Sequence, residues 1–299
     1  MAVDIRPRVT VGMPVYNGAQ TLSRVLESIS KQSYEDFRLV ISDNASTDTT
    51  ESICRELASE HRRVVYIRQP TNIGASANFD FVLAKADTEY FMWAAADDIH
   101  SSDFIEKNVE FLDSHPDFLG STCPVRFQGG DYNAVTMGDQ SRDEPDRFER
   151  ILKFFEAWHA NGRFYSLFRT EALRSAKLSG KTFLGADWVT VIELLNRGKL
   201  KRLDCGFLEL GRKGVSNSLE AFSAFRQRRI CWVVPFFDVS VHAARLLKRA
   251  QFRQKSRLFI SLLKLNRWAF NLQIRFELKR IYLKLRKTST LSAGLNQAR

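Results

Sequence analysis

Along the first hundred residues, the apolar positions follow two alternating spacings. Four short segments are mostly apolar or apolar at every second position, as at Val9, Val11 and Met13, which predicts strands. These segments are 8–15, 37–42, 63–69 and 89–95. The segments after each of them carry apolar residues three or four positions apart, which predicts helices over 19–32, 48–61, 74–86 and 101–115, the last of them stopped by Pro116. In the second of these helices, Asp48 and Glu51 have the spacing of a capping pair.

Strands that alternate with helices predict a Rossmann-like α/β fold, with a mostly parallel sheet flanked by helices on both faces. In such sheets the ligand crevice lies beyond the carboxyl ends of the strands. Three polar segments follow strands: PVYNG after the first, SDNASTD after the second and AADDI after the fourth. We therefore expect Asp43, Asp97 and Asp98 to lie together on one rim.

Beyond residue 117 the pattern is looser. The polar stretch 129–146 predicts a loop, 147–160 and 186–198 predict helices, and 163–170 predicts a strand. From residue 219 onward the signal is nearly all helical. The expected organisation is an α/β domain over residues 1–218 with a helical C-terminal extension over residues 219–299.

Charge divides the chain at nearly the same place. Residues 1–220 hold 27 Lys/Arg and 32 Asp/Glu, a net charge of −5, whereas residues 221–299 hold 18 Lys/Arg and two acids, a net charge of +16. The four cysteines are scattered without metal-site spacing, which fits a reducing cytoplasm. The chain has no run of about 18 apolar residues and enters a strand pattern at once, so we expect neither a membrane-spanning helix nor a secretory signal.

Four segments in this order and spacing, TVGMPVYNG, LVISDNASTDTT, TNIGASAN and WAAADDI, resemble the family 2 glycosyltransferases of the GT-A fold. The resemblance covers roughly residues 8–220. It extends to a sub-group with YGLFR, represented here by Tyr165–Arg169 (YSLFR), and G-x-D, here Gly185–Asp187. The resemblance implies that residues 1–218 are a catalytic domain. It also implies transfer of a sugar from a nucleotide-diphosphate donor to an acceptor, with inversion of the anomeric centre.

The family's acidic D-x-D-D motif is incomplete in this chain, which has Ala95, Ala96, Asp97 and Asp98. By resemblance, Asp97 is the metal ligand, for Mg²⁺ or Mn²⁺, and Asp98 supports the metal or the donor sugar. Hard cations of this kind need only one or two protein carboxylates beside the phosphates. The lost first acid predicts weaker metal affinity. The alternative is that one of the two acids caps the helix that starts near Ser101.

The donor-binding residues that the resemblance implies lie in the loops after the first two strands. Asp43 and Asn44 occupy the family's base-recognition turn, where Asn44 leaves the identity of the base open because an amide both donates and accepts. Pro14, Tyr16 and Asn17 match the first donor loop, and the Tyr16 ring is placed to pack on the base. The alternative for Asp43 is an Asx-turn that leads into the next helix.

Two further residues complete the site that the resemblance implies. Asp187 matches the base that takes the proton from the acceptor hydroxyl, and an acid in that position is also an ordinary helix cap. Where many relatives have a metal-binding His, the stretch 210–218 carries Arg212, which would bind the donor by neutralising the leaving diphosphate. The alternative for Arg212 is plain surface charge.

The basic C-terminal region has an apolar helical stripe, with basic residues gathered on another face. The stripe is formed by Leu258, Leu262, Leu265, Ala269, Leu272, Phe276 and Leu283. A helix divided in this way fits an anionic membrane surface, which predicts a peripheral position on the inner face of the cell membrane. The alternatives are docking on the catalytic domain or on a second copy in a homo-oligomer. No nucleic-acid partner is expected, because no recognisable nucleic-acid module accompanies the charge.

The function predicted from these patterns is a metal-assisted, inverting hexosyltransferase that uses a glycan or lipid-linked acceptor in surface polysaccharide biosynthesis. One alternative is a degenerate module that binds a nucleotide sugar without turnover. The other is a nucleotidyltransferase, which should carry a loop rich in glycine and basic residues after the first strand. The segment PVYNGAQT lacks that pattern.

Overall fold

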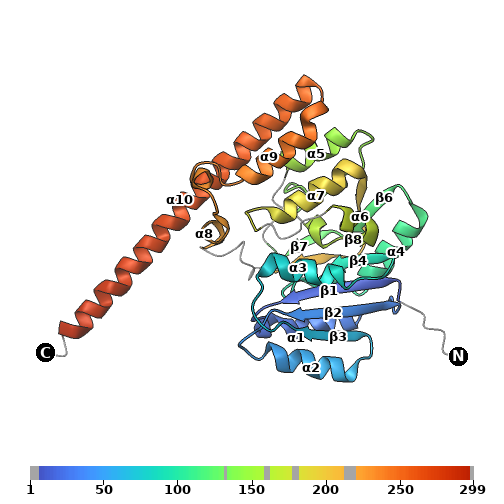
Figure 1. Ribbon diagram of the computed structural model, residues 1–299, viewed down its shortest axis with the longest axis horizontal. Coiled ribbons are helices and arrows are strands. Elements are labelled where there is room, and N and C mark those ends of the chain that lie inside the picture. Colours follow the sequence, from blue (N-terminus) through green and yellow to red (C-terminus); the bar gives the residue numbers. More distant parts are fainter. Residues whose placement is uncertain (1–6, 131–132, 158–161, 177–181, 212–219, 297–299) are drawn as a thin grey trace.

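The computed structural model describes residues 7–130, 133–157, 162–176, 182–211 and 220–296, with side chains as far as Leu283 in the last helix. Over these residues the strands form a main sheet, ordered β3-β2-β1-β4-β8-β6-β9, and a small sheet, ordered β5-β10-β7 (Figure 1). The main-sheet strands are β1 (Val9–Val15), β2 (Phe37–Asp43), β3 (Val64–Arg68), β4 (Tyr90–Trp93), β6 (Phe118–Thr122), β8 (Leu167–Arg169) and β9 (Lys199–Arg202). The small-sheet strands are β5 (Ile99–His100), β7 (Val125–Phe127) and β10 (Leu208–Leu210).

The helices follow the strands in the expected alternation and then dominate the C-terminal region. They are α1 (Ala19–Ser30), α2 (Thr50–Glu60), α3 (Ala75–Ala84), α4 (Phe104–Ser114), α5 (Arg147–Glu156), α6 (Thr170–Ser175), α7 (Ala186–Arg197), α8 (Ala221–Phe225), α9 (Phe237–Leu246) and α10 (Phe252–Asn296). Short 3₁₀ turns cover Gly162–Tyr165, Arg229–Trp232 and Leu247–Arg249.

The first half of the main sheet is parallel. Strands β3, β2, β1 and β4 run in one direction, and β8 runs antiparallel between β4 and β6. The register pairs Val15 at the end of β1 with Asp43 at the end of β2, so the loops after these strands emerge side by side. The predicted fold, a mostly parallel sheet flanked by helices with a helical C-terminal extension, is confirmed.

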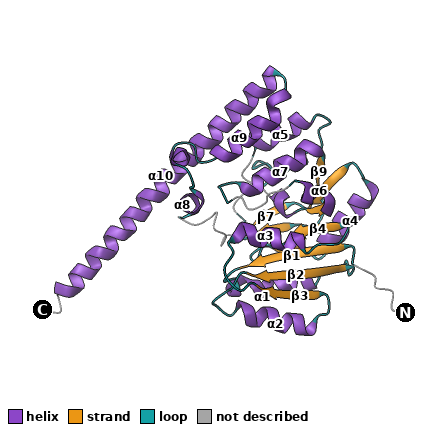
Figure 2. Cartoon of the chain, in the orientation of Figure 1, coloured by secondary structure: helices purple, strands orange, loops and turns teal. Residues whose placement is uncertain are grey.

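Alternate residues of each central strand enter different hydrophobic layers. In β4, Tyr90 and Met92 pack with the layer under α1, α2 and α4, whereas Phe91 and Trp93 pack with the layer that holds α3, α6 and α7. The two helical layers cover opposite faces of the sheet (Figure 2). A Cβ on Gly12 would come within 2.7 Å of the Phe91 ring, so this glycine lets the sheet and α3 approach closely.

Several local predictions were wrong. The predicted strand over 163–170 is extended only at Leu167–Arg169, because Gly162–Tyr165 form a 3₁₀ turn. Strands β6 and β9 and the whole small sheet were missed, since they are held by pairing between segments that are distant in the sequence. Asp48 and Glu51 do not form a capping box. Instead, Asp48 accepts hydrogen bonds from the backbone N–H groups of Thr50 and Ala19.

The C-terminal region shares a hydrophobic core with the sheet domain. Four residues of the predicted apolar stripe, Leu258, Leu262, Leu265 and Ala269, are buried in one cluster with side chains of α5, α7 and α9. Beyond this docked part, α10 extends away from the body (Figure 1). The predicted membrane-facing role of these four residues is therefore wrong, because they already face protein. The boundary after residue 218 falls outside the described residues, so the domain division stays a prediction.

No helix in the described ranges combines the length and the apolar character that crossing a bilayer requires.

Candidate functional site

The loops that follow β1 and β2 are tied together by side chains of both. Asn17 accepts a hydrogen bond at Oδ1 from the backbone N–H of Thr47, at 2.8 Å, and its own N–H donates to Ser46 Oγ at 2.9 Å. Asn17 has a φ of 50°, in the left-handed region that Asn tolerates better than most residues. The Thr21 hydroxyl donates to the carbonyl of Ala96 at 2.7 Å, which attaches the segment after β4. Three strand ends therefore meet at one rim.

Asp43 is fully buried at this rim and anchors it. Its Oδ1 accepts from the backbone N–H of Ser46 at 2.8 Å, and its Oδ2 accepts from the Tyr66 hydroxyl at 2.8 Å and from Arg68 at 2.7 Å. Burial acts to raise the pKa of Asp43, but the hydrogen bonds from Ser46, Tyr66 and Arg68 outweigh it, so the pKa is lowered. The hydrogen bond from Ser46 spans three residues, whereas the Asx-turn expected as the alternative role joins residues two apart, so that turn is not formed. Contact between Asp43 and a base stays a prediction.

Asn44 is also engaged within the protein. Its Nδ2 donates to Asn72 Oδ1 at 2.9 Å, and its Oδ1 accepts from the backbone N–H of Ile73 at 2.8 Å. Asn72 in turn accepts from the N–H of Gly74, which has a φ of +84°. Asn44 thus holds the turn before α3, and its predicted contact with the base is untested.

The acid pair lies between the two sheets. Asp98 is buried, and its Oδ1 accepts from the backbone N–H of Gly211 at 2.8 Å, directly after β10. Burial raises the pKa of Asp98 to about 7, the Gly211 N–H lowers it and the charge of Asp97 raises it further. Neither acid caps α4, because β5 intervenes and Asp103 occupies the N-cap position. The alternative reading of the pair as helix caps is wrong.

Gly211 lies directly against Asp97. A Cβ on Gly211 would come within 2.5 Å of the backbone carbonyl oxygen of Asp97 and would overlap its carboxylate. Asp97 itself is partly exposed, in contrast to Asp98. The residue directly after β10 therefore contacts both acids of the pair. The residue that follows, Arg212, lies outside the described residues, as does the rest of 212–219.

Tyr165 marks the point where three carboxylates converge. It follows Phe164 in the 3₁₀ turn, contacts both hydrophobic clusters and is partly buried. Burial raises its pKa well above the usual value, and the negative charges of Asp98, Asp187 and Asp97, in that order, raise it further. Asp187 and the acid pair therefore act electrostatically on the same Tyr165 hydroxyl, although about ninety residues of chain separate them.

Asp187 is held in the first turn of α7 by packing from the C-terminal region. Gly185 is the N-cap residue with a φ of +81°, and a Cβ there would meet Val239 at 2.9 Å and the Phe236 ring at 3.0 Å. Trp188 stacks on Phe236 with ring centroids 5.0 Å apart. Helix α9 therefore fixes the position of α7. The dipole of α7 also favours a negative charge at Asp187.

The remaining predicted donor residues occupy the end of β1. Pro14 is buried within the strand, and Tyr16, the first residue after the strand, is 50% exposed. The exposed Tyr16 ring is available to pack on a planar ligand.

The acid pair fits a hard divalent cation. Asp98 Oδ2 is buried without a hydrogen-bond partner among the described residues, and Asp97 lies beside it with part of its surface open. Mg²⁺ and Mn²⁺ are bound by carboxylate oxygens and complete their shells with phosphates and water. Within the ranges that the structure describes, no group of three or more His, Cys, Asp or Glu forms a ready-made metal cage. The donor phosphates would therefore supply the remaining ligands.

Sequence reasoning missed the residues that support the site. Tyr66 and Arg68 anchor Asp43, Gly211 abuts Asp97, and Tyr165 sits among the three acids. Of these residues, only Tyr165 could have been found from the sequence, because it is the first residue of the YSLFR motif. His100, two residues after Asp98, is buried and packs edge-on to Phe104, and burial lowers its pKa to about 4. It therefore stays neutral at physiological pH.

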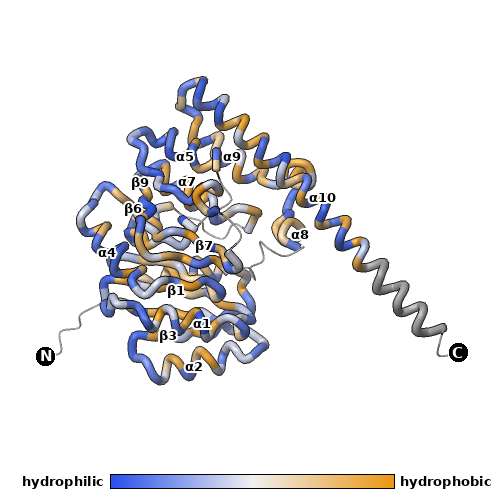
Figure 3. Tube along the Cα trace, turned by 180° about the vertical axis from the view of Figure 1, so that it is seen from behind, coloured by the Kyte–Doolittle hydropathy of each residue, from blue (hydrophilic) through white to orange (hydrophobic). Residues whose placement is uncertain are grey.

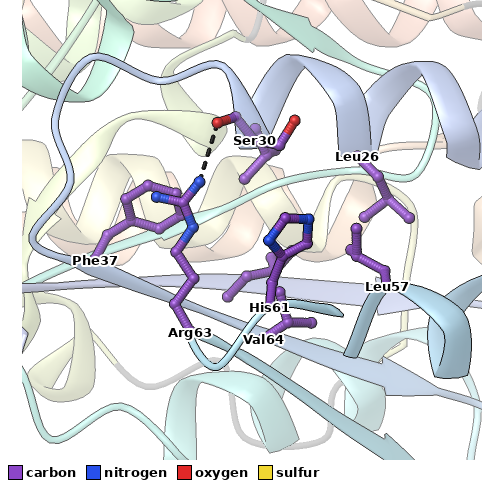
Figure 4. Close-up of a pocket in the computed structure, with 9 residues that line it drawn as sticks. Leu26, Ser30, Phe37, Leu57, His61, Arg63 and Val64 are labelled. Carbon is purple, nitrogen blue, oxygen red and sulfur yellow. Dashed lines mark hydrogen bonds between the residues drawn. The ribbon is translucent and has the colours of Figure 1, made fainter. Parts of the chain in front are cut away.

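A hollow between α1 and α2 lies away from the acids. It is lined by apolar side chains such as Leu26, Leu57 and Val64, and Arg63 closes it by donating to the Ser30 carbonyl at 3.0 Å (Figure 4). The Arg63 guanidinium also lies 4.6 Å from the centre of the Phe37 ring. This hollow belongs to the packing of the helices on the sheet.

Comparison with solved structures shows that the chain has a known fold. The chain superimposes on S. aureus TarS 1–349 with a TM-score of 0.63 at 16% identity, over 86% of this chain and 70% of TarS. It superimposes on the mannosyltransferase PcManGT from Pyrobaculum calidifontis, in complex with GDP-Man and Mn²⁺, with a TM-score of 0.58 at 20% identity. That match covers 97% of this chain and 81% of the other. At these identities the likeness establishes the fold alone.

Sequence comparison gives the family. The putative glycosyltransferase EpsE of Bacillus subtilis (strain 168) is 36% identical over 110 residues, which are 36% of this chain and 40% of EpsE. An uncharacterized glycosyltransferase of Haemophilus influenzae is 32% identical over 106 residues, 36% of this chain and 42% of the relative. The chain thus spans about two fifths of the length of these relatives. The model of the family "Glycosyl transferase family 2" matches residues 10–176, more than half of the chain, and the protein therefore belongs to glycosyl transferase family 2.

Proposed function

We propose that this protein is an inverting glycosyltransferase that moves a hexosyl group from a nucleoside-diphosphate sugar to a hydroxyl of a glycan or lipid-linked acceptor. The observation that supports it is that Asp97 and Asp98, after the end of β4, and Asp187, in the first turn of α7, all act electrostatically on the buried Tyr165 hydroxyl. The raised pKa values of Asp98 and Tyr165 support this, because perturbed titratable groups beyond the strand ends of an α/β sheet are typical of a catalytic site. The cellular role that we propose is surface polysaccharide biosynthesis.

The donor would lie across the ends of β1 and β2, with its diphosphate toward the acid pair. Tyr16 would pack on the base, and the Asp43 and Asn44 turn would limit which bases fit. Asp97 would hold Mg²⁺ or Mn²⁺, which supplies charge neutralisation to the diphosphate when bound. Asp98, through its bond to Gly211, would hold the wall of the site in place.

Transfer requires one base. In the proposed step, Asp187 accepts the proton of the acceptor hydroxyl while the acceptor oxygen bonds to the anomeric carbon. The bond from that carbon to the phosphate oxygen breaks, and the nucleoside diphosphate leaves. A single displacement of this kind inverts the anomeric centre, and a positioned base contributes about 10²–10⁴-fold to the rate.

The donor can be identified by thermal protection. UDP-GlcNAc and GDP-mannose are suitable first probes, because TarS and PcManGT have been crystallised with these nucleotide sugars. A donor at a hundredfold excess over its Kd stabilises the folded state by about 2.7 kcal/mol, so the true donor raises the unfolding midpoint while other nucleotides do not. This donor-induced rise in the unfolding midpoint should depend on the presence of Mn²⁺ or Mg²⁺.

Two variants separate binding from turnover. Asp187→Asn should keep the donor-induced shift and lose at least a hundredfold of transfer, because it removes only the base. Asp97→Asn should lose the part of the shift that depends on metal. Asp204→Asn, at a carboxylate whose side chain is 94% exposed, is the matched control and should change neither measurement.

Both alternative functions have distinct outcomes. A degenerate binding module would show the donor shift in the parent protein without transfer or donor hydrolysis. A nucleotidyltransferase would form a nucleotide sugar from a nucleoside triphosphate and a sugar phosphate. If Asp97→Asn and Asp187→Asn both transferred sugar at the parental rate, the proposed site would be wrong.

A further inference from the structure

Helix α10 has a second apolar face that the protein leaves exposed. It runs along the helix from Phe252 to Ile281, opposite the face that docks on the body. Its members and their exposed fractions are Phe252 (85%), Phe259 (68%), Ile260 (50%), Leu263 (59%), Phe270 (36%), Ile274 (38%), Leu278 (62%) and Ile281 (51%). We call this set the outer stripe. The docked face, with Leu258, Leu265 and Ala269, is buried and cannot supply the same contacts.

The spacing of the outer stripe keeps it on one side of the helix. Phe252, Leu263 and Ile274 are eleven residues apart, and Phe259, Phe270 and Ile281 repeat the same interval. Eleven residues make three turns at about 3.67 residues per turn, close to the 3.6 of an α-helix, so the stripe hardly drifts around the axis. At about 1.5 Å per residue it is ~45 Å long. In Figure 3, apolar and polar segments alternate along the part of α10 that leaves the body.

Positive charge lies beside the outer stripe. Five exposed cations border it on one side: Arg253, Lys264, Arg267, Arg275 and Lys279. The helix contains one acid, Glu277, and its side chain is only 17% exposed because it pairs with Arg226 and Arg280. The exposed side of the described part of α10 therefore combines apolar and basic residues without a carboxylate to balance them.

We propose that the outer stripe of α10 binds the surface of an anionic lipid bilayer. Large apolar side chains with a basic border suit the boundary between acyl chains and anionic headgroups, where the apolar groups insert and the cations contact phosphates. Docking on a second copy through the same stripe would instead bring two basic borders together without an acid to neutralise them. The inference does not depend on any step of the proposed transfer reaction.

The experiment is co-sedimentation of the full chain with vesicles of phosphatidylcholine alone or mixed with phosphatidylglycerol. Binding to the mixed vesicles should be at least tenfold stronger than to the neutral ones and should weaken with added salt. The triple variant Phe259→Ser, Leu263→Ser and Phe270→Ser should bind the mixed vesicles at least tenfold more weakly. The pair Lys264→Gln and Arg267→Gln should lose about tenfold or more, since each cation near an anionic surface contributes about 1 kcal/mol.

The controls keep the test independent of folding and of catalysis. Val65→Ser removes an apolar side chain of similar exposure, 43%, from the edge strand β3 and should bind vesicles like the parent protein. Circular dichroism should show unchanged helix content in the triple variant, because its three residues are exposed. Loss of vesicle binding with retained donor binding supports the proposal whether or not transfer is detected.

Two results would overturn the proposal. The first is equal binding of the parent and the triple variant to anionic vesicles. The second is a parent protein that is dimeric by light scattering and does not sediment with vesicles, while the triple variant is monomeric. That second outcome would assign the outer stripe to a contact between copies of the chain.

Discussion

The strongest test of the site concerns Asp43, a fully buried carboxylate that anchors the loop after β2. Asp43→Asn keeps the acceptor for the Ser46 N–H at Oδ1 but places an amide N–H₂ where Oδ2 accepts from Tyr66 and Arg68. The variant therefore replaces two accepted hydrogen bonds with donor groups facing donors, and it removes the charge that Arg68 neutralises.

The magnitude follows from these contacts. The hydrogen bond from the neutral Tyr66 contributes about 0.5–1.5 kcal/mol and one from a charged group about 1.5–3 kcal/mol. The Arg68 side chain is 32% exposed and can be hydrated when unpaired, so its share is reduced by roughly half. We expect Asp43→Asn to lower the free energy of unfolding by about 1–3 kcal/mol, or about 2–5 °C in the unfolding midpoint of a chain of this length.

The assay is thermal unfolding of matched variants without ligand. Glu51→Gln removes the other acid near Arg68, at 3.2 Å and with a 35% exposed side chain, and should cost under about 1 kcal/mol. Tyr66→Phe removes one hydrogen bond to Asp43 and should cost about 1 kcal/mol. If Asp43→Asn unfolded within a degree of the parent while losing nucleotide binding, Asp43 would be a base-recognition residue and the anchoring role would be refuted.

The pH dependence of the unfolding midpoint, measured for the parent protein and for Asp43→Asn, gives a second test. Because the pKa of Asp43 is lowered in the folded state, its carboxylate stabilises the fold above its ordinary pKa of 3.8, and this stabilisation is lost as the pH falls through the lowered value. The difference in unfolding midpoint between the parent and Asp43→Asn should have its full size near neutral pH and should become smaller below about pH 4. A difference that stayed constant down to pH 3 would contradict the lowered pKa.

Two glycines give further tests. Gly185→Ala should destabilise the fold more than Gly130→Ala. Both glycines have a positive φ, but only Gly185 faces Val239 and Phe236, within 3.1 Å of a new Cβ, whereas Gly130 has no atom within 4 Å. Thermal midpoints measure this difference, and equal midpoints would show that α9 does not press on the turn before Asp187. Gly211→Ala should weaken metal-dependent donor binding at least tenfold and also lower the unfolding midpoint, because a new Cβ would meet the backbone carbonyl oxygen of Asp97 as well as its carboxylate. Unchanged donor titrations would separate Gly211 from the site.

The sequence alone determined the alternation of strands and helices over the first 116 residues. Strand spacing at Val9, Val11 and Met13 and helix spacing at Leu22, Val25 and Ile29 are local signals, and each residue was found on its predicted buried face. The parallel order and the convergence of polar loops at one rim follow from the connections between the strands. A strand, a helix and a second parallel strand are almost always connected with the same, right-handed crossover.

Tertiary structure decided what each of these residues contacts. The sequence placed Asp43 at the rim, but the burial of its carboxylate depends on Tyr66 and Arg68 from a different strand. The small sheet that brings Gly211 to Asp98 consists of strands of two or three residues, too short to carry a periodic signal. In α10, two apolar stripes share one helix, and only the packing against α5, α7 and α9 distinguishes the docked stripe from the exposed one. Periodicity reports that a face is apolar, and contacts from distant segments determine what covers it.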